Sequence, residues 1–211
     1  MKSALDKARE SPQSTKARIL QAAQEVFAAR GFEGASTREI AARAEVNISS
    51  LHYHWESKET LYLAVFENIY HQLVELVRKN IVKPTSADDA RAMIERTMGL
   101  TFDFYADNPT VPRLLMRRVI ESEAMGEAPE RDIMGPAWRM FAEWTREFAG
   151  DRLPERDVAF FMLTVQSVLL VLMLDTSHVS AILGGGVSDP AIRARLREQV
   201  IHLVETLVGV K

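Results

Sequence analysis

Apolar residues recur at a helical period along most of the chain. They return every three or four residues from Ile19 to Phe27, from Leu61 to Val77 and from Ile192 to Leu207, a spacing that places them on one face of an α-helix. No stretch of useful length alternates apolar and polar residues as a half-buried strand does. The pattern therefore predicts an all-α fold.

Capping residues and helix breakers divide this pattern into separate helices. Ser14 or Thr15 caps a first helix that stops at Gly31, and a longer helix runs from Ser57 to about Val82. Clusters of Asn, Gly and Pro punctuate the rest of the chain. They predict further helices at about 87–106, 111–122, 134–149, 155–174 and 189–208.

The segment between these first two helices predicts a helix, a tight turn and a short second helix. Ser36 and Glu39 form a capping box at its start, and Asn47 is a good N-cap for the second helix, from Ile48 to about Trp55. That helix is too short to be stable alone, so buried side chains must hold it against its neighbours. Such a helix-turn-helix places its second helix in the major groove of DNA.

The side chains left over on this unit suit base edges and phosphate oxygens, because they are small, polar or aromatic donors and acceptors. At the start of the first helix a hydroxyl, a guanidinium and free amides can converge on one phosphate. Lys58, at the start of the following helix, makes a second phosphate contact. The candidate DNA-binding residues are Thr37, Arg38, Ile48, Ser49, Ser50, His52, Tyr53, His54 and Lys58.

The stretch from Ile19 to Tyr62 resembles the tetracycline-repressor (TetR) family of bacterial regulators. The resemblance rests on ILQAAQEVFAARGFEGASTREIAARAEVNISSLHYHWESKETLY, above all on the order of leucine, aromatic cluster, serine, lysine and glutamate between Leu51 and Glu59. It implies that DNA is contacted by Thr37, Arg38, Tyr53 and Lys58.

Four positions depart from the family pattern. The family usually has glycine where Glu45 and Ser49 stand, tyrosine where His52 stands and phenylalanine where Trp55 stands. His52 matters most, because an imidazole replaces a hydroxyl that frequently contacts phosphate. Trp55 is interpreted as a core aromatic that closes the three-helix unit.

The predicted organisation is an arm followed by two domains. Residues 1–13 are charged and contain Pro12, which favours a mobile arm over one that follows a groove of DNA. Residues 14–82 are predicted to form a three-helix, helix-turn-helix DNA-binding domain with a bridging helix. Residues 83–211 are predicted to form a C-terminal helical bundle for ligand binding and dimerisation.

Charge and composition narrow the class of protein. The 211 residues are 47% hydrophobic and carry a net charge of −3, which argues against a uniformly basic nucleic-acid coat. Residues 1–58 carry +2 and the remainder −5, so the positive charge lies in the predicted DNA-binding part. With no cysteine the chain forms no disulfide or thiolate metal site, which fits a reducing cytoplasm. The first residues lack a signal-peptide stretch, so we expect a cytoplasmic protein.

The most apolar run, Val158–Leu174, is predicted to be a buried helix. It is shorter than the ~20 apolar residues of a membrane span and carries Thr164, Gln166 and Ser167 in its middle. A helix that is apolar nearly all round needs cover on several sides, and a second copy of the chain is one plausible cover. The family resemblance likewise implies a homodimer whose interface is formed by the last two long helices.

Aromatic residues of the C-terminal half are candidates for a ligand pocket between helices, with ordinary core as the alternative. Arg118 belongs to a basic cluster that suits an anionic ligand or, alternatively, forms a solvated face paired with Glu121 and Glu123. No histidine has metal-ligand spacing, so neither a metal nor a cofactor is predicted. The candidate ligand-binding residues are Phe102, Tyr105, Arg118, Phe141, Trp144 and Phe161.

These features together predict a homodimeric transcriptional regulator. The preferred hypothesis is a repressor that a small-molecule effector releases from a palindromic operator, by biasing the bridging helix after Ser57. One alternative is a helical enzyme, although no nucleophile motif, metal constellation or cofactor fingerprint follows Tyr62. Another is a DNA-binding adaptor without a small-molecule ligand.

Overall fold

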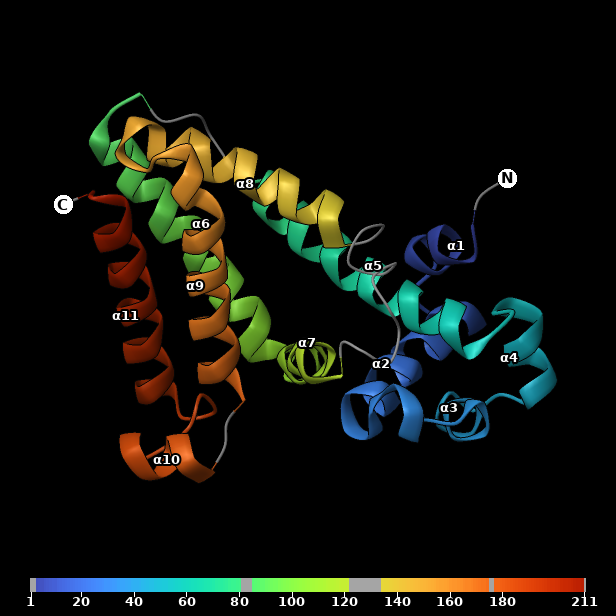
Figure 1. The fold of residues 1–211 in the computed structure, drawn as a ribbon. Coiled ribbons are helices and arrows are strands. Elements are labelled where there is room, and N and C mark those ends of the chain that lie inside the picture. The colour runs from blue at the N-terminus through green and yellow to red at the C-terminus, as the bar shows by residue number, and fades with distance from the viewer. Residues whose placement is uncertain (1–2, 81–84, 122–133, 175–176, 211) are drawn as a thin grey trace. The chain divides into compact units, whose positions relative to one another are not determined.

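The computed structural model describes residues 3–80, 85–121, 134–174 and 177–210. These residues form helices and no strand, which confirms the all-α prediction. The α-helices, labelled in Figure 1, are α1 (Ala4–Glu10), α2 (Thr15–Gly34), α3 (Thr37–Arg43), α4 (Ile48–His54), α5 (Lys58–Arg78), α6 (Ala87–Asp107), α7 (Thr110–Ile120), α8 (Gly135–Ala149), α9 (Glu155–Met173), α10 (Ser177–Leu183) and α11 (Pro190–Val208), with a 3₁₀ turn, η3, at Gly150–Arg152.

The helices form two compact units. The N-terminal unit comprises Met1–His71 and Arg113–Gly135, and the C-terminal unit comprises Gln72–Pro112 and Pro136–Lys211. The division therefore falls inside α5 and inside α7, and differs from the predicted boundary at residue 82. Most of α7 belongs with the N-terminal helices because its side chains bond to α2, as described below.

The predicted mobile arm is wrong for α1. Ser3 and Asp6 form a reciprocal capping box at its start, and Leu5 and Ala8 are buried. The guanidinium of Arg9 donates to Asn68 Oδ1 at 3.2 Å and to the Glu67 carbonyl at 3.0 Å. Residues 4–10 are thus a helix that is bonded to α5.

The core of the N-terminal unit is a cluster of aromatic rings from α2 and α5. The Tyr62 ring lies 4.9 Å from Phe27, 5.0 Å from Phe32 and 4.9 Å from Phe66 between ring centroids, all at steep interplanar angles. Edge-to-face pairs of this kind contribute roughly 0.5–1.5 kcal/mol beyond their buried area. They fix the start of α5 against the end of α2, on either side of the helix-turn-helix.

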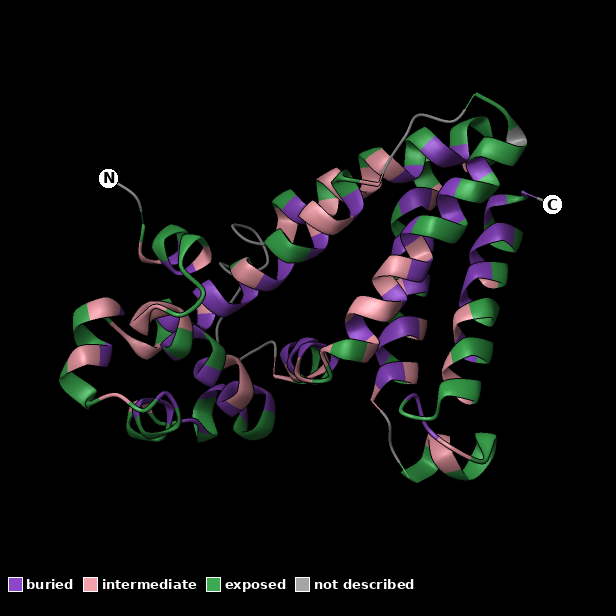
Figure 2. Ribbon diagram, turned by 180° about the vertical axis from the view of Figure 1, so that it is seen from behind, coloured by how far each residue is buried: buried purple, intermediate pink, exposed green. Residues whose placement is uncertain are grey.

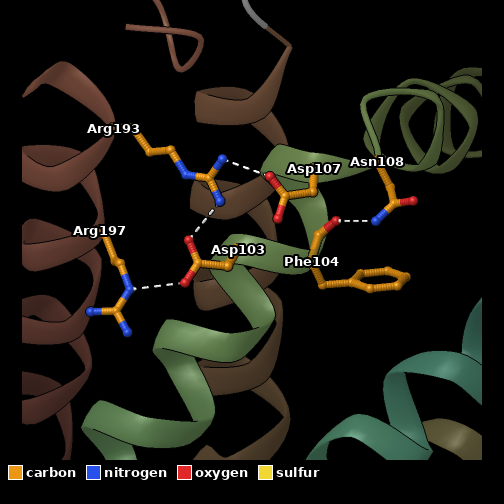
Figure 3. A network of polar contacts seen from close by, with 6 residues as sticks. All are labelled: Asp103, Phe104, Asp107, Asn108, Arg193 and Arg197. Carbon is orange, nitrogen blue, oxygen red and sulfur yellow. Dashed lines mark hydrogen bonds and ion pairs between the residues drawn. The ribbon is translucent and has the colours of Figure 1, made fainter. Parts of the chain in front are cut away.

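The C-terminal unit is built on α6, α9 and α11, which lie side by side (Figure 1). An acidic–basic cluster joins α6 to α11: Arg193 donates to Asp103 at 2.8 Å and to Asp107 at 2.6 Å, and Arg197 donates to Asp103 at 3.2 Å (Figure 3). A Cβ at Gly99 would lie 2.0 Å from Nη2 of Arg197. Glycine therefore lets the guanidinium lie directly against α6.

Two features of the last helices differ from expectation. Within the described residues one helix, α9, is long and apolar enough to cross a membrane by length and composition, yet one side of it packs against α6 and α11. The other side leaves Phe160, Leu163 and Val171 exposed by 72%, 59% and 51%. Figure 2 colours the ribbon of the described residues by burial. The helix α10 is largely exposed and was not among the predicted helices.

Candidate nucleic-acid interface

The first helix of the predicted helix-turn-helix, α3, begins at a side-chain cap and is joined to α2 by ion pairs. The Ser36 hydroxyl accepts from the Glu39 amide at 3.1 Å, which is the first half of the predicted capping box. The Glu39 carboxylate lies 3.6 Å from Arg30 Nε instead of completing the box. Arg43, in the last turn of α3, pairs with Glu25 of α2. Both ends of α3 are thus held against α2.

The turn after α3 contains a strained residue. Glu45 has a φ of +54° and is the one residue other than glycine with positive φ in the described parts of the chain. The left-handed conformation costs an L-residue roughly 1–2 kcal/mol. The amide of Val46 donates to the Ala41 carbonyl at 3.0 Å and closes the turn. Glu45 is the position where the TetR pattern usually has glycine, and the backbone conformation explains that preference.

The second helix, α4, has one buried and one exposed face. Asn47 caps it as predicted, its Oδ1 accepting from the Ser50 amide at 2.7 Å. Leu51 is fully buried and Trp55 is 3% exposed, which confirms both as core residues. The exposed face carries Ile48, Ser49, His52 and, 85% exposed, Tyr53.

Comparison with known proteins agrees with this geometry. The model of the family described as "Bacterial regulatory proteins, tetR family" matches residues 19–65, from α2 into α5. The HTH-type transcriptional regulator YttP of Bacillus subtilis is 26% identical over 179 residues, 81% of this chain and 82% of that protein. Residues 19–65 therefore form a DNA-binding segment of the tetR type.

Other relatives support the assignment over shorter lengths. The HTH-type transcriptional repressor SCO4008 of Streptomyces coelicolor is 34% identical over 104 residues, 49% of each chain. The chain spans about half the length of several such relatives. The structure of the fatty acid degradation regulator FadR from Bacillus halodurans matches 91% of this chain and 93% of that one with a TM-score of 0.68 and 14% identity. That likeness shows the shared fold.

Among the other predicted DNA contacts, His54 is half-buried on α4, whereas His52 is exposed. His54 is two positions after His52, and this spacing turns it about 200° from His52 around the helix axis. Its Nδ1 is buried and has no hydrogen-bond partner. Burial and, secondarily, the charge of Lys16 lower the pKa of His54. The lowered pKa disfavours the charged form of the imidazole, and a DNA contact by His54 stays a prediction.

Thr37 and Arg38 lie in the first turn of α3, the former half-buried and the latter exposed, and Ser50 is half-buried on α4. Lys58 is bonded within the protein. Its ammonium donates to the Phe32 carbonyl at 3.0 Å and the Ala35 carbonyl at 3.3 Å, and lies 4.3 Å from the centroid of the Phe32 ring. An ammonium has three N–H donors, so at most one remains for a phosphate.

Two residues of the N-terminal unit were not predicted to matter for DNA binding. Arg117 of α7 donates to the Ala28 and Ala29 carbonyls at 2.9 and 2.8 Å, and Glu121 accepts from the Phe32 amide at 3.3 Å. The predicted pairing of the basic cluster with Glu121 is present, at 3.0 Å from Arg117, whereas Glu123 lies outside the described residues. The bonds of Arg117 and Glu121 to α2 could not be predicted from the sequence, because an i,i+4 pair of opposite charges does not indicate which distant groups it contacts.

The candidate ligand-binding residues do not form one group. Phe102, Tyr105 and Phe161 are buried in the C-terminal unit, and burial raises the pKa of Tyr105. Phe141 and Trp144 form a half-buried edge-to-face pair, 5.5 Å between ring centroids. Arg118 is 2% exposed and belongs to the N-terminal unit. The aromatic residues thus share one unit, and Arg118 lies in the other.

Proposed function

We propose that this chain is a sequence-specific transcriptional repressor that a small-molecule effector releases from a palindromic operator. The observation that carries the proposal is the exposed face of α4, where Tyr53 is 85% exposed while Leu51 and Trp55 on the opposite face are buried. An aromatic side chain that contributes nothing to the core is available to contact DNA. The name of the relative SCO4008 supports repression.

The side chains on this face divide by chemistry. Ser49 and His52 carry donors and acceptors that suit base edges in the major groove, and the methyl groups of Ile48 suit the methyl of thymine. Arg38 is an exposed cation on α3, the helix that crosses the DNA backbone in a helix-turn-helix. It therefore contacts phosphate and contributes affinity without sequence information. Thr37 and Ser50 are proposed as weaker polar contacts.

A homodimer supplies the second half of the operator contact. Phe160, Leu163 and Val171 expose an apolar strip along α9, and a second copy of α9 and α11 would cover it. Two reading helices related by a two-fold axis contact half-sites about 34–36 Å apart. One seven-residue helix makes too few contacts for specific binding by itself.

Effector binding acts through the C-terminal unit. Phe102, Tyr105, Phe141, Trp144 and Phe161 place aromatic surface in this unit, which suits an apolar or aromatic ligand. The helix α5 contributes residues to both units, so a ligand that shifts it alters the spacing of the two reading helices. Such a ligand must bind the DNA-incompetent state more tightly than the competent one. We place this regulation in the bacterial cytoplasm.

The test is selection of duplexes from random double-stranded DNA by the purified protein, followed by stoichiometry on the selected sequence. A palindrome bound by a dimer or a pair of dimers is the expected result. Absence of enrichment by folded protein, or a single half-site bound by a monomer, would contradict the proposal. A reporter under the selected sequence then distinguishes repression from activation.

Arg38→Ala serves as the residue-level test, with Arg139→Ala, exposed on α8, as the matched control. Loss of one phosphate contact lowers the slope of log K against log salt by about 0.9 and weakens binding to all duplexes. The control leaves affinity and slope unchanged. A changed sequence preference with an unchanged slope would assign Arg38 to base contact instead.

A further inference from the structure

The helix α2 is broken shortly before the helix-turn-helix begins. Gly31 has φ 74° and ψ 179°, outside the helical range, although the helix resumes for one more turn. At a helix end the last carbonyls and the next amides lack their usual partners and need others. Here these groups are the carbonyls of Ala28 and Ala29, before the break, and the amide of Phe32, after it. Residues 31–35 are called the α2–α3 junction below.

Side chains of α7 supply the missing partners. The Nε of Arg117 donates to the Ala28 carbonyl and its Nη2 to the Ala29 carbonyl, while Nη1 donates to Glu121 Oε1. The other oxygen of Glu121 accepts from the Phe32 amide. Residues four apart lie on the same face of a helix, and the Glu121 amide continues α7 by donating to the Arg117 carbonyl. Side chains from one face at the end of α7 therefore bond to the carbonyls before the break and to the amide after it.

Glycine at the break is required by this contact as well as by its backbone angle. A Cβ on residue 31 would lie 2.5 Å from Oε1 and 2.8 Å from Oε2 of Glu121. From α5, Lys58 bonds to the Phe32 and Ala35 carbonyls at the same junction. The junction is therefore held by side chains from two other helices, and it leads directly into Ser36, the N-cap of α3.

We infer that Arg117 and Glu121 are positioning residues for operator binding. They fix the break in α2, and with it the direction in which α3 and α4 leave the junction, without contacting DNA. The inference rests on the proposed function and deepens it. It gives two residues outside the helix-turn-helix a role in orienting the helices that contact DNA. Unsatisfied carbonyls at the break would otherwise let the junction sample other conformations.

The first measurement needs no DNA. In the full-length protein, Glu121→Ala should speed amide hydrogen exchange in peptides that cover residues 31–35, and Glu121→Gln should largely restore protection because its amide oxygen still accepts from Phe32. Arg113→Ala, an exposed arginine on the same helix, is the control and should leave exchange unchanged. Unchanged exchange in Glu121→Ala would overturn the inference.

The second measurement uses the selected duplex and a random-sequence duplex. Arg117→Ala should weaken binding to the selected duplex about tenfold, equivalent to about 1.4 kcal/mol, with an unchanged salt slope because no phosphate contact is lost. Arg113→Ala should leave affinity unchanged. Circular dichroism confirms that each variant is folded at the assay temperature. If Arg117→Ala is not folded, Glu121→Ala replaces it, with Glu121→Gln as the variant expected to restore affinity.

Three results of the second measurement would overturn the inference: unchanged affinity, a lower salt slope, or a loss that only follows the unfolded fraction. If no duplex is selected at all, the role in operator binding falls with the proposed function. The exchange measurement then still shows whether the pair holds the junction, so the two failures are distinguishable.

Discussion

The short helices of the N-terminal unit and the long helices of the C-terminal unit are stabilised in different ways. α3 and α4 have seven residues each, below the length at which a helix is stable alone in water. The cap at Ser36 and ion pairs to α2 hold α3 in place. The cap at Asn47 and buried Leu51 hold α4. α6, α9 and α11 have 19 to 21 residues and pack through long apolar faces.

The difference shows where single side chains decide the outcome. In the N-terminal unit each short helix depends on one or two buried residues and on a few hydrogen bonds, so removal of one group affects the whole helix. In the C-terminal unit the stability is distributed over many apolar contacts, so no single side chain decides it. Burial of the exposed strip on α9 by a second copy of the chain would add further stability. Four variants test this contrast, from the largest expected effect to the smallest.

Leu51→Ala should have the largest effect. Leu51 is fully buried and is the buried residue within α4 itself, so its truncation should lower the free energy of unfolding by about 2–5 kcal/mol. Urea unfolding followed by hydrogen exchange should locate the loss in the N-terminal unit, with operator binding abolished. Ile182→Ala, 68% exposed on α10, is the control. Equal loss of protection in α9 and α11 would contradict the contrast.

Charge on the exposed strip of α9 should break the dimer. Phe160→Arg combined with Leu163→Arg places two cations where a second copy would bury apolar surface, and sedimentation should show a monomer that keeps its helical circular dichroism. Loss of bivalent contact should weaken binding to the palindrome about a hundredfold. A double variant that remains dimeric would move the interface elsewhere.

Glu45→Gly should stabilise the N-terminal unit. Glycine adopts φ +54° without the steric cost that a Cβ brings, so the free energy of unfolding should rise by about 1 kcal/mol. Glu45→Ala keeps the Cβ and should bring no such gain. The measurement is urea unfolding of the two variants, and the midpoint of Glu45→Gly should be the higher. Equal midpoints would show that the backbone of the turn is not strained.

The pH dependence of His54 is the smallest expected effect. Because burial lowers the folded-state pKa of His54, the unfolded chain binds its proton more readily, and stability should fall as the pH drops from the unfolded value of about 6.5 toward the lower folded value. His54→Asn should reduce the difference in urea midpoint between pH 7 and pH 5. His178→Asn, exposed on α10, should not.

Local signals in the sequence predicted the local structure well. The caps at Ser36 and Asn47 and the burial of Leu51 and Trp55 follow from residue type and spacing, and the structure confirms them. The helix α1 was missed because seven residues with two buried positions give almost no periodicity. Its Ser3–Asp6 capping box was nevertheless visible in the sequence.

Contacts between distant segments could not be predicted in the same way. Arg117 and Glu121 look like an ordinary i,i+4 pair, and their partners on α2 lie 88 or 89 residues away in the sequence. The bonds of Lys58 to the Phe32 and Ala35 carbonyls could not be predicted either, because backbone carbonyls carry no residue signature. The two-residue spacing that turns His54 about 200° from His52 is visible in the sequence, whereas the burial of its Nδ1 depends on the fold.

The bonds from α7 to α2 limit how this chain can be recombined with other proteins. A chimera that joined residues 1–82 to the regulatory half of another protein would keep every residue of the helix-turn-helix yet leave the carbonyls of Ala28 and Ala29 and the Phe32 amide without Arg117 and Glu121. A functional exchange therefore has to carry residues 113–121 along with the N-terminal helices, or choose a donor whose own α7 supplies an arginine and a glutamate at the same spacing.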